Sequence, residues 1–166
     1  MQYDGHTPID LEQERIEILN AFKGLLRATK DRSRDETKLI RKAFDIALEA
    51  HKDMRRKSGE PYIYHPISVA RICAEEMGLE PTAIVCALLH DTVEDTVVDL
   101  EELRADFGSE IADLIDGVTK LDRVEFEDRD EAQAAKTLVQ VLEHVKDDEK
   151  RQHPAHQRQL VPPVPV

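Results

Sequence analysis

The sequence has 166 residues, which is enough for one domain with a hydrophobic core and too few for two generous ones. Hydrophobic residues make up 40% of the chain, but aromatic residues make up only 4% and Trp is absent, so an aliphatic core of packed helices is expected rather than a β-sandwich. The formal net charge of −12 at pH 7 argues against general nucleic-acid binding and against binding to a membrane surface.

Helical periodicity organises the N-terminal part of the chain. Residues 1–10 are polar and lack an apolar run like that of a signal peptide, so we expect a flexible lead. Apolar residues at helical spacing predict one helix from about Leu11 to about Lys30 and a second that reaches about His51. Asp35 lies at the charged break between them and is predicted to cap the second helix.

Proline and glycine residues divide the middle of the chain. The sequence SGEP at residues 58–61 predicts a turn, so residues 62–65 are expected to form a loop or an extended piece. Pro66 fits the first position of a third helix, and Gly78 is its predicted C-terminal stop. Pro81 opens a fourth helix that is apolar on nearly every side, and such a helix belongs at the centre of a bundle.

Further helices are predicted downstream. Asp99 and Glu102 resemble a capping box for a short helix that ends at Gly108. Ser109 is predicted to cap the helix that follows. A final helix is expected from about residue 130 to residue 145.

The predicted elements give an all-α fold in three parts. Residues 1–35 form an N-terminal lead and helix, residues 36–146 a helical-bundle domain, and residues 147–166 a polar, proline-containing tail that is expected to be disordered. Cys73 and Cys86 lack the spacing of a metal site and lie in apolar stretches, so we expect them to be buried and reduced. Since no segment approaches the length of a membrane span, the expected location is the cytoplasm.

A basic cluster interrupts this acidic chain. Lys52, Arg55, Arg56 and Lys57 fall within one short segment. A solvated helix end is the commoner explanation for such a cluster. The competing interpretation is a binding site for a small, highly anionic ligand.

A histidine–aspartate pair, His90 and Asp91, follows the most apolar predicted helix. Such a pair is more often a helix end than a metal site, but His65 lies one helix upstream, and Glu94 with Asp95 follows His90 by about one helical turn. Imidazole and carboxylate ligands select a divalent ion such as Mn²⁺, Fe²⁺ or Zn²⁺. Such an ion would polarise a phosphoryl oxygen and activate water, so the pattern points to metal-assisted hydrolysis of a phosphate ester or pyrophosphate.

Three segments carry a specific resemblance. Residues 56–66 (RKSGEPYIYHP), 87–96 (ALLHDTVEDT) and 117–121 (GVTKL) are similar to the signature of RelA/SpoT homologues, within the HD superfamily of metal-dependent phosphohydrolases. The similarity runs from about residue 36 to residue 134. Several separate motifs occur in the right order and at the right spacing, which makes chance resemblance very improbable.

The resemblance implies that residues 36–146 are an HD-type hydrolase domain of helical-bundle fold. In the family this domain removes the 3′ pyrophosphate of (p)ppGpp, a small nucleotide, with one bound Mn²⁺, although other divalent ions would fit. The resemblance assigns metal binding to His65, His90 and Asp91, activation of the attacking water to Glu94 and Asp95, and nucleotide binding to Arg56, Lys57 and Ser58.

The sequence departs from the family after residue 134. The family's downstream motif, Leu-Ala-Asp-Arg-x-His-Asn-Met-Arg, supplies a fourth metal ligand and nucleotide contacts, and nothing like it occurs here. His144, Asp147 and Asp148 are substitutes in principle, although ordinary surface residues are the commoner outcome at such positions. The synthetase domain of long family members is missing as well, so we expect a truncated member that makes no ppGpp.

Three functions stay open at this point. The first is an active (p)ppGpp hydrolase, complete or completed by its tail or by a partner. The second is a catalytically impaired remnant or regulatory module that binds nucleotide or another RelA/SpoT protein. The third, an HD hydrolase for a different nucleotide, is disfavoured by the match at residues 56–62.

Overall fold

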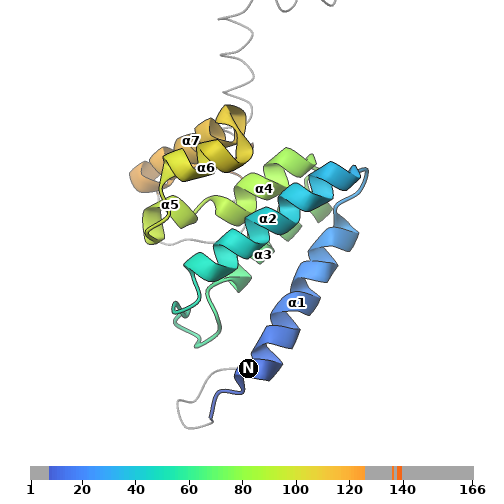
Figure 1. Ribbon diagram of the computed structural model, residues 1–166, viewed down its shortest axis with the longest axis vertical. Coiled ribbons are helices and arrows are strands. Elements are labelled where there is room, and N and C mark those ends of the chain that lie inside the picture. The colour runs from blue at the N-terminus through green and yellow to red at the C-terminus, as the bar shows by residue number, and fades with distance from the viewer. Residues whose placement is uncertain (1–7, 126–135, 137, 140–166) are drawn as a thin grey trace, which may run out of the picture.

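The computed structural model describes residues 8–125, 136, 138 and 139 (Figure 1). Every element that it describes is a helix, and the part of the chain so described forms no strand beyond a single bridge between Arg55 and Pro61. The all-α prediction is therefore confirmed. The helices are α1 (Leu11–Ala28), α2 (Arg34–Ala50), α3 (Tyr64–Glu75), α4 (Pro81–Leu89), α5 (Thr92–Asp95), α6 (Leu100–Phe107) and α7 (Ser109–Glu125).

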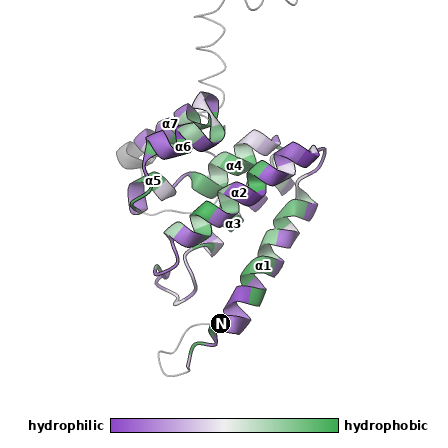
Figure 2. Ribbon diagram, viewed as in Figure 1, coloured by the Kyte–Doolittle hydropathy of each residue, from purple (hydrophilic) through white to green (hydrophobic). Residues whose placement is uncertain are grey.

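Helix α4 lies at the centre of the described bundle, as its apolar sequence predicts. It packs against α2, α3 and α7, and all its residues except Thr82 are buried. α1 lies against α3, and its hydrophobic and hydrophilic residues alternate along the ribbon as in an amphipathic helix (Figure 2). The core is mainly aliphatic, with one aromatic pair, Phe22 and Phe44, whose ring centroids are 4.1 Å apart.

Helix α2 is capped by Ser33, so the prediction of Asp35 as its cap was wrong. The Ser33 hydroxyl accepts a hydrogen bond from the Glu36 backbone N–H (3.1 Å), and the Glu36 carboxylate accepts one from the Ser33 N–H (2.9 Å). This reciprocal pair is a capping box, which satisfies two otherwise orphaned donors. Asp35 instead lies in the first turn, where its negative charge faces the positive end of the helix dipole.

Helix α3 begins at Tyr64, two residues before the proline that was predicted to open it. Residues 62–65 are therefore not wholly a loop. Pro66 is tolerated inside the first turn because the first four N–H groups of a helix have no intrahelical partner to lose. The earlier start places His65 on the helix itself, where it is buried.

The remaining boundaries lie close to the predictions. α3 ends at Glu75, and Gly78 then adopts a left-handed conformation with φ of 60°, which is accessible to glycine. The capping box of Asp99 and Glu102 at the start of α6 is confirmed. Ser109 is the first residue of α7 rather than its cap, because the carbonyl of Gly108 already accepts from Ala112 N–H (3.2 Å).

Two predictions fall largely outside the described residues. The predicted helix over residues 130–145 is described only at 136, 138 and 139, and the tail at 147–166 is not described. The division into 1–35, 36–146 and 147–166 stays a prediction. No described helix combines the length and the hydrophobicity needed to cross a membrane.

Candidate metal centre

Three of the predicted site residues, His65, His90 and Asp91, meet in one buried cluster. Each offers one ligand atom, and these atoms lie within 4.8 Å of one another. His65 Nε2 is 3.2 Å from Asp91 Oδ2, and His90 Nε2 is 3.1 Å from the same oxygen. The side chains are 3%, 2% and 1% exposed. The structure therefore brings the three predicted ligands together, and their metal-binding role stays a prediction.

The helix order explains why residues so far apart in the sequence meet. His65 is the second residue of α3, whereas His90 immediately follows the last residue of α4. α3 and α4 pack against each other, and the ring centroids of His65 and His90 are 5.4 Å apart, so the start of α3 lies beside the end of α4. Because α4 is buried along its length, the polar residues at its end are carried into the interior.

The hydrogen bond on the far side of the His90 ring fixes how the ring faces the cluster. Nδ1 lies 2.5 Å from the carbonyl oxygen of Ala87. A neutral ring that donates Nδ1–H to this carbonyl leaves Nε2 with a lone pair directed at Asp91. That lone pair then faces a carboxylate oxygen at 3.1 Å, an arrangement that a cation between the two atoms stabilises.

The spacing of the ligand atoms fits one metal ion. Metal–nitrogen and metal–carboxylate bonds are about 2.0–2.2 Å long for an ion such as zinc. The 3.1 and 3.2 Å separations to Asp91 Oδ2 are shorter than two such bonds end to end, so one ion can contact all three residues. Two imidazoles and one carboxylate are also a donor set suited to borderline divalent metals. The cluster is a candidate metal site.

The electrostatics of Asp91 favour its charged form. Burial alone would raise the pKa of this carboxyl, but without a metal the charge and the hydrogen bonds that His90 and His65 supply in their protonated forms outweigh burial and hold the pKa well below its usual range. The carboxylate therefore stays ionised and able to bind a cation at neutral pH.

Tyr62, to which the sequence analysis gave no role, also enters the site. Its hydroxyl lies 2.8 Å from Asp91 Oδ2 and 3.3 Å from Asp95 Oδ2. Asp95, one of the two predicted water-activating residues, is thus joined to the cluster. Glu94, the other, precedes it on α5 and is half-buried. The only sequence signal for Tyr62 was its position inside the matched segment, three residues before His65.

The predicted nucleotide-binding residues lie on the loop between α2 and α3. Arg56 N–H donates to the Glu60 carbonyl, and Gly59 N–H donates to the Arg56 carbonyl, both at 2.9 Å. Lys57 and Ser58 are exposed, and Arg56 is half-buried. In the sequence, these three residues lie a few positions before Tyr62 and His65. Their role in nucleotide binding stays a prediction.

The basic cluster of the sequence separates into two kinds of residue. Lys52 pairs with Glu49 at 2.7 Å at the end of α2, and Arg55 pairs with Glu14 of α1 at 2.8 Å. Lys52 thus fits the solvated helix end. Arg56 and Lys57 instead belong to the turn between α2 and α3, where the Arg56 backbone pairs with Gly59 and Glu60.

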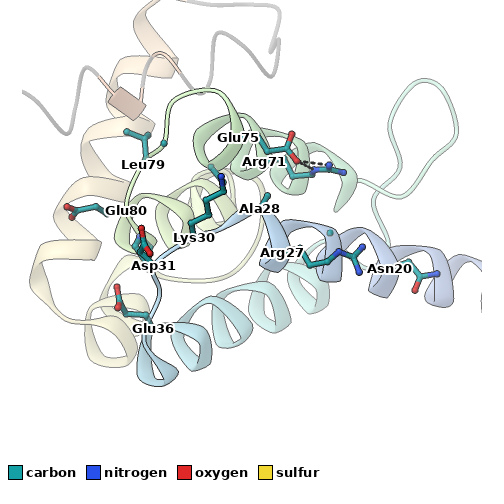
Figure 3. Close-up of a pocket in the computed structure, with 14 residues that line it drawn as sticks. Asn20, Arg27, Ala28, Lys30, Asp31, Glu36, Arg71, Glu75, Leu79 and Glu80 are labelled. Carbon is teal, nitrogen blue, oxygen red and sulfur yellow. Dashed lines mark hydrogen bonds and ion pairs between the residues drawn. The ribbon is translucent and has the colours of Figure 1, made fainter.

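A separate pocket lies among α1, α3 and the start of α4 (Figure 3). None of the predicted site residues lines it. Arg71 and Glu75 form an ion pair inside it, with an N–O distance of 2.7 Å. Its mixture of charges gives no preference for a polyanion, because it combines Arg27, Lys30 and Arg71 with Asp31, Glu36, Glu75 and Glu80.

Known proteins resemble this chain over 60–68% of its length. The chain is 50% identical over 108 residues to a guanosine-3′,5′-bis(diphosphate) 3′-pyrophosphohydrolase of Vibrio cholerae, a match that covers 65% of this chain and 15% of that protein. It is 42% identical over 113 residues to the bifunctional (p)ppGpp synthase/hydrolase SpoT of Escherichia coli K12, covering 68% of this chain and 16% of the relative. A GTP pyrophosphokinase of Streptomyces coelicolor is 47% identical over 100 residues, covering 60% of this chain and 12% of the relative.

The chain therefore spans about one seventh of the length of these relatives. A family profile described as HD domain matches residues 43–155, which is more than half of the chain and includes His65, His90 and Asp91. The chain belongs to the HD domain family, in its RelA/SpoT branch.

Proposed function

We propose that this chain hydrolyses (p)ppGpp, releasing the 3′ pyrophosphate with the help of one Mn²⁺ ion. The observation that carries the proposal is the buried cluster of His65, His90 and Asp91, with its ligand atoms within 4.8 Å of one another. The segment that holds it is 50% identical to a relative named for this reaction. Two buried free cysteines fit a reducing compartment, and we place the activity in the cytoplasm.

In this proposal His65, His90 and Asp91 hold the metal. When bound, the ion supplies Lewis-acid stabilisation of phosphoryl charge and a more acidic water. Asp95 and Glu94 take the proton of the attacking water and orient it, as carboxylates placed beside the reacting group do. The water oxygen bonds to phosphorus as the bond from phosphorus to the ribose 3′ oxygen breaks, and the 3′ oxygen takes up a proton to become a hydroxyl. The products are pyrophosphate and the nucleoside 5′-diphosphate or 5′-triphosphate.

The loop between α2 and α3 holds the substrate in this proposal. A guanidinium group is planar and weakly hydrated, so Arg56 can lie against the face of a guanine base. Lys57 supplies a positive charge for phosphate, and Ser58 a hydroxyl that can donate to an anionic oxygen. The chain as a whole is acidic, so this small basic turn concentrates the attraction for a polyanion at one place.

The test is release of pyrophosphate from ppGpp during a Mn²⁺ titration. We expect Mn²⁺-dependent release that Asp91→Ala abolishes and that Asp45→Ala leaves unchanged. Asp45 is a matched control because it is an exposed aspartate that pairs with Arg41 on α2, away from the cluster. Release that persists without any divalent metal, or that survives Asp91→Ala, contradicts the proposal.

A second candidate function rests on the residues after 134, which differ from the family's downstream motif. Among the described residues, three ligands gather rather than the four that the family resemblance implies. Loss of one carboxylate removes a bond and a negative charge, so the metal is held less tightly and turnover is slow. In this form the chain binds nucleotide or another RelA/SpoT protein. It then regulates that protein and does not hydrolyse (p)ppGpp. Binding of ppGpp without release of pyrophosphate at any Mn²⁺ concentration identifies this second function.

A further inference from the structure

The Tyr62 side chain joins two carboxylates of different proposed roles. Its hydroxyl is 2.8 Å from Oδ2 of Asp91, a proposed metal ligand. It is 3.3 Å from Oδ2 of Asp95, which we propose activates water. A phenol has a single hydrogen, so the shorter contact receives the stronger hydrogen bond and the longer one shares it.

The contact with Asp91 involves the oxygen on which the cluster converges. The same Oδ2 faces His65 Nε2 and His90 Nε2. A hydrogen bond to that oxygen fixes the rotation of the carboxylate, and therefore where its second oxygen and its lone pairs point. Hydrogen bonds from outside partners orient metal ligands in this way, and their loss weakens metal binding or activity.

The Tyr62 ring is held in place from two sides. His51, buried at the end of α2, stacks against it with a centroid distance of 4.8 Å and an interplanar angle of 26°. The His51 ring is itself fixed, because its Nδ1 lies 2.8 Å from the Ala47 carbonyl. The Tyr62 backbone N–H donates to the Met54 carbonyl at 3.0 Å, which closes the loop. Because the Tyr62 side chain is already fixed, it loses little conformational entropy when its hydroxyl binds the Asp91 carboxylate.

We propose that Tyr62 is a positioning residue: its hydroxyl sets Asp91 for metal binding and keeps Asp95 at a fixed place beside it, while His51 supports the phenol ring. This role rests on the proposed metal centre. It links the substrate loop, which ends at Tyr62, to the chemistry at α4 and α5. It requires no proton transfer by Tyr62.

The primary test replaces Tyr62 by Phe, which removes one oxygen atom and keeps the ring against His51. Tyr64→Phe is the matched control, because it deletes the same hydroxyl two residues away, outside the cluster. We expect Tyr62→Phe to weaken Mn²⁺ binding by about 10-fold in calorimetry, at the lower end of the usual range for an outer partner of a metal ligand. We expect kcat to fall by about 10–100-fold with KM for ppGpp nearly unchanged. Tyr64→Phe should match the wild type in both measurements.

Two further measurements separate positioning from a general structural role. In a double-mutant cycle, Tyr62→Phe and Asp95→Asn should lower kcat by less together than the product of their separate effects, because they remove the same contact. His51→Leu leaves the hydroxyl in place but removes the stacked ring, and should weaken Mn²⁺ binding in the same direction by a smaller factor. If circular dichroism shows that Tyr62→Phe does not fold, the Mn²⁺ affinity of His51→Leu becomes the test.

The inference is overturned if Tyr62→Phe and His51→Leu both bind Mn²⁺ as the wild type does. It is also overturned if KM alone rises, since the hydroxyl would then contact substrate. A wild-type chain that binds Mn²⁺ but releases no pyrophosphate contradicts the proposed function only, because the Mn²⁺ affinities of the Tyr62 and Tyr64 variants still decide the role of Tyr62.

Discussion

Two kinds of charged residue share the candidate site, and they act in different surroundings. Asp91 is fully buried and its charge is stabilised by two imidazoles, so it belongs to a preorganised interior. Arg56 is half-buried, on the turn between α2 and α3. A buried charge decides whether an ion binds, whereas a charge at the rim decides how a polyanion approaches and is oriented.

This difference predicts a selective effect of Arg56→Ala. We expect this variant to weaken binding of guanosine tetraphosphate by about 2–30-fold, as loss of a guanidinium contact with an aromatic face worth about 0.5–2 kcal/mol does. Mn²⁺ binding should stay close to that of the wild type, because guanidinium is not a metal ligand. Calorimetric titration of each ligand into both proteins measures the two effects. Arg34→Ala, at the exposed start of α2, is the control, and equal losses of nucleotide and Mn²⁺ binding would point to misfolding instead.

At the residue scale, the sequence predicted the proximity of His65, His90 and Asp91 but not the contacts of Tyr62. A His-Asp pair after an apolar helix is visible in the sequence, because burial follows from composition. The Tyr62 contacts with Asp91 and Asp95 span 29 and 33 residues and depend on the packing of α3 against α4. No local pattern encodes such a contact.

At the scale of single elements, the ends of helices decide where functional residues lie. α2 ends at Ala50, its C-cap His51 stacks on the Tyr62 ring, and α3 begins early enough to include His65. The prediction placed Pro66 at the first position of α3 because proline is favoured there. The helix begins two residues earlier, since tertiary packing of Ile63 and His65 outweighs that preference. Helix ends are set by such competitions, and sequence patterns locate them less well than helix centres.

The cap of α2 gives a prediction that separates two neighbouring residues. Ser33→Ala should lower the free energy of unfolding by about 1 kcal/mol, because the capping hydrogen bond to Glu36 N–H is lost. Asp35→Ala is the matched control in the first turn. It should lower the free energy of unfolding by only about 0.3 kcal/mol, through the lost interaction with the helix dipole. Urea unfolding followed by circular dichroism measures both. A larger loss for Asp35→Ala would restore Asp35 as the cap.

His51 at the end of α2 gives a pH dependence with a defined sign. Burial lowers the pKa of His51 below 6.5, and the opposing effects of the Ala47 carbonyl, Asp91 and Asp95 do not cancel this. The unfolded chain therefore binds a proton near pH 6.5 that the folded chain does not, so this contribution to stability is present above pH 6.5 and is lost as the pH falls.

The measurement is urea unfolding of metal-free protein between pH 7.5 and pH 5. We expect the free energy of unfolding to fall with decreasing pH more steeply for the wild type than for His51→Gln, by at most about 1.4 kcal/mol per pH unit for one proton. Equal slopes for the two proteins would show that His51 is protonated alike in the folded and unfolded states.

At the scale of the whole molecule, the candidate metal ligands come from different helices of one core. His65 belongs to α3, while His90 and Asp91 lie between α4 and α5, and α4 also contacts α2 and α7. The all-α architecture and the central place of α4 were predictable, because apolar periodicity is strong over long helices. Their mutual arrangement was not, since it depends on side-chain packing between segments distant in the sequence.

Because the ligands are brought together only by folding, Mn²⁺ should stabilise the entire bundle. A ligand that binds the folded state alone adds RT ln(1 + [L]/Kd), or about 2.7 kcal/mol when the free ligand is 100 times Kd. We expect the thermal midpoint to rise with Mn²⁺ concentration and to return to its starting value when a chelator removes the ion.

Asp91→Ala should abolish this metal-dependent shift. Its effect on the midpoint without metal does not matter to the test, because removing a buried charge can change stability in either direction. Asp45→Ala should keep the full shift, as its carboxylate pairs with Arg41 on the surface of α2. A shift that persists in Asp91→Ala would place the ion elsewhere on this acidic chain, and the buried cluster would then not be the metal site.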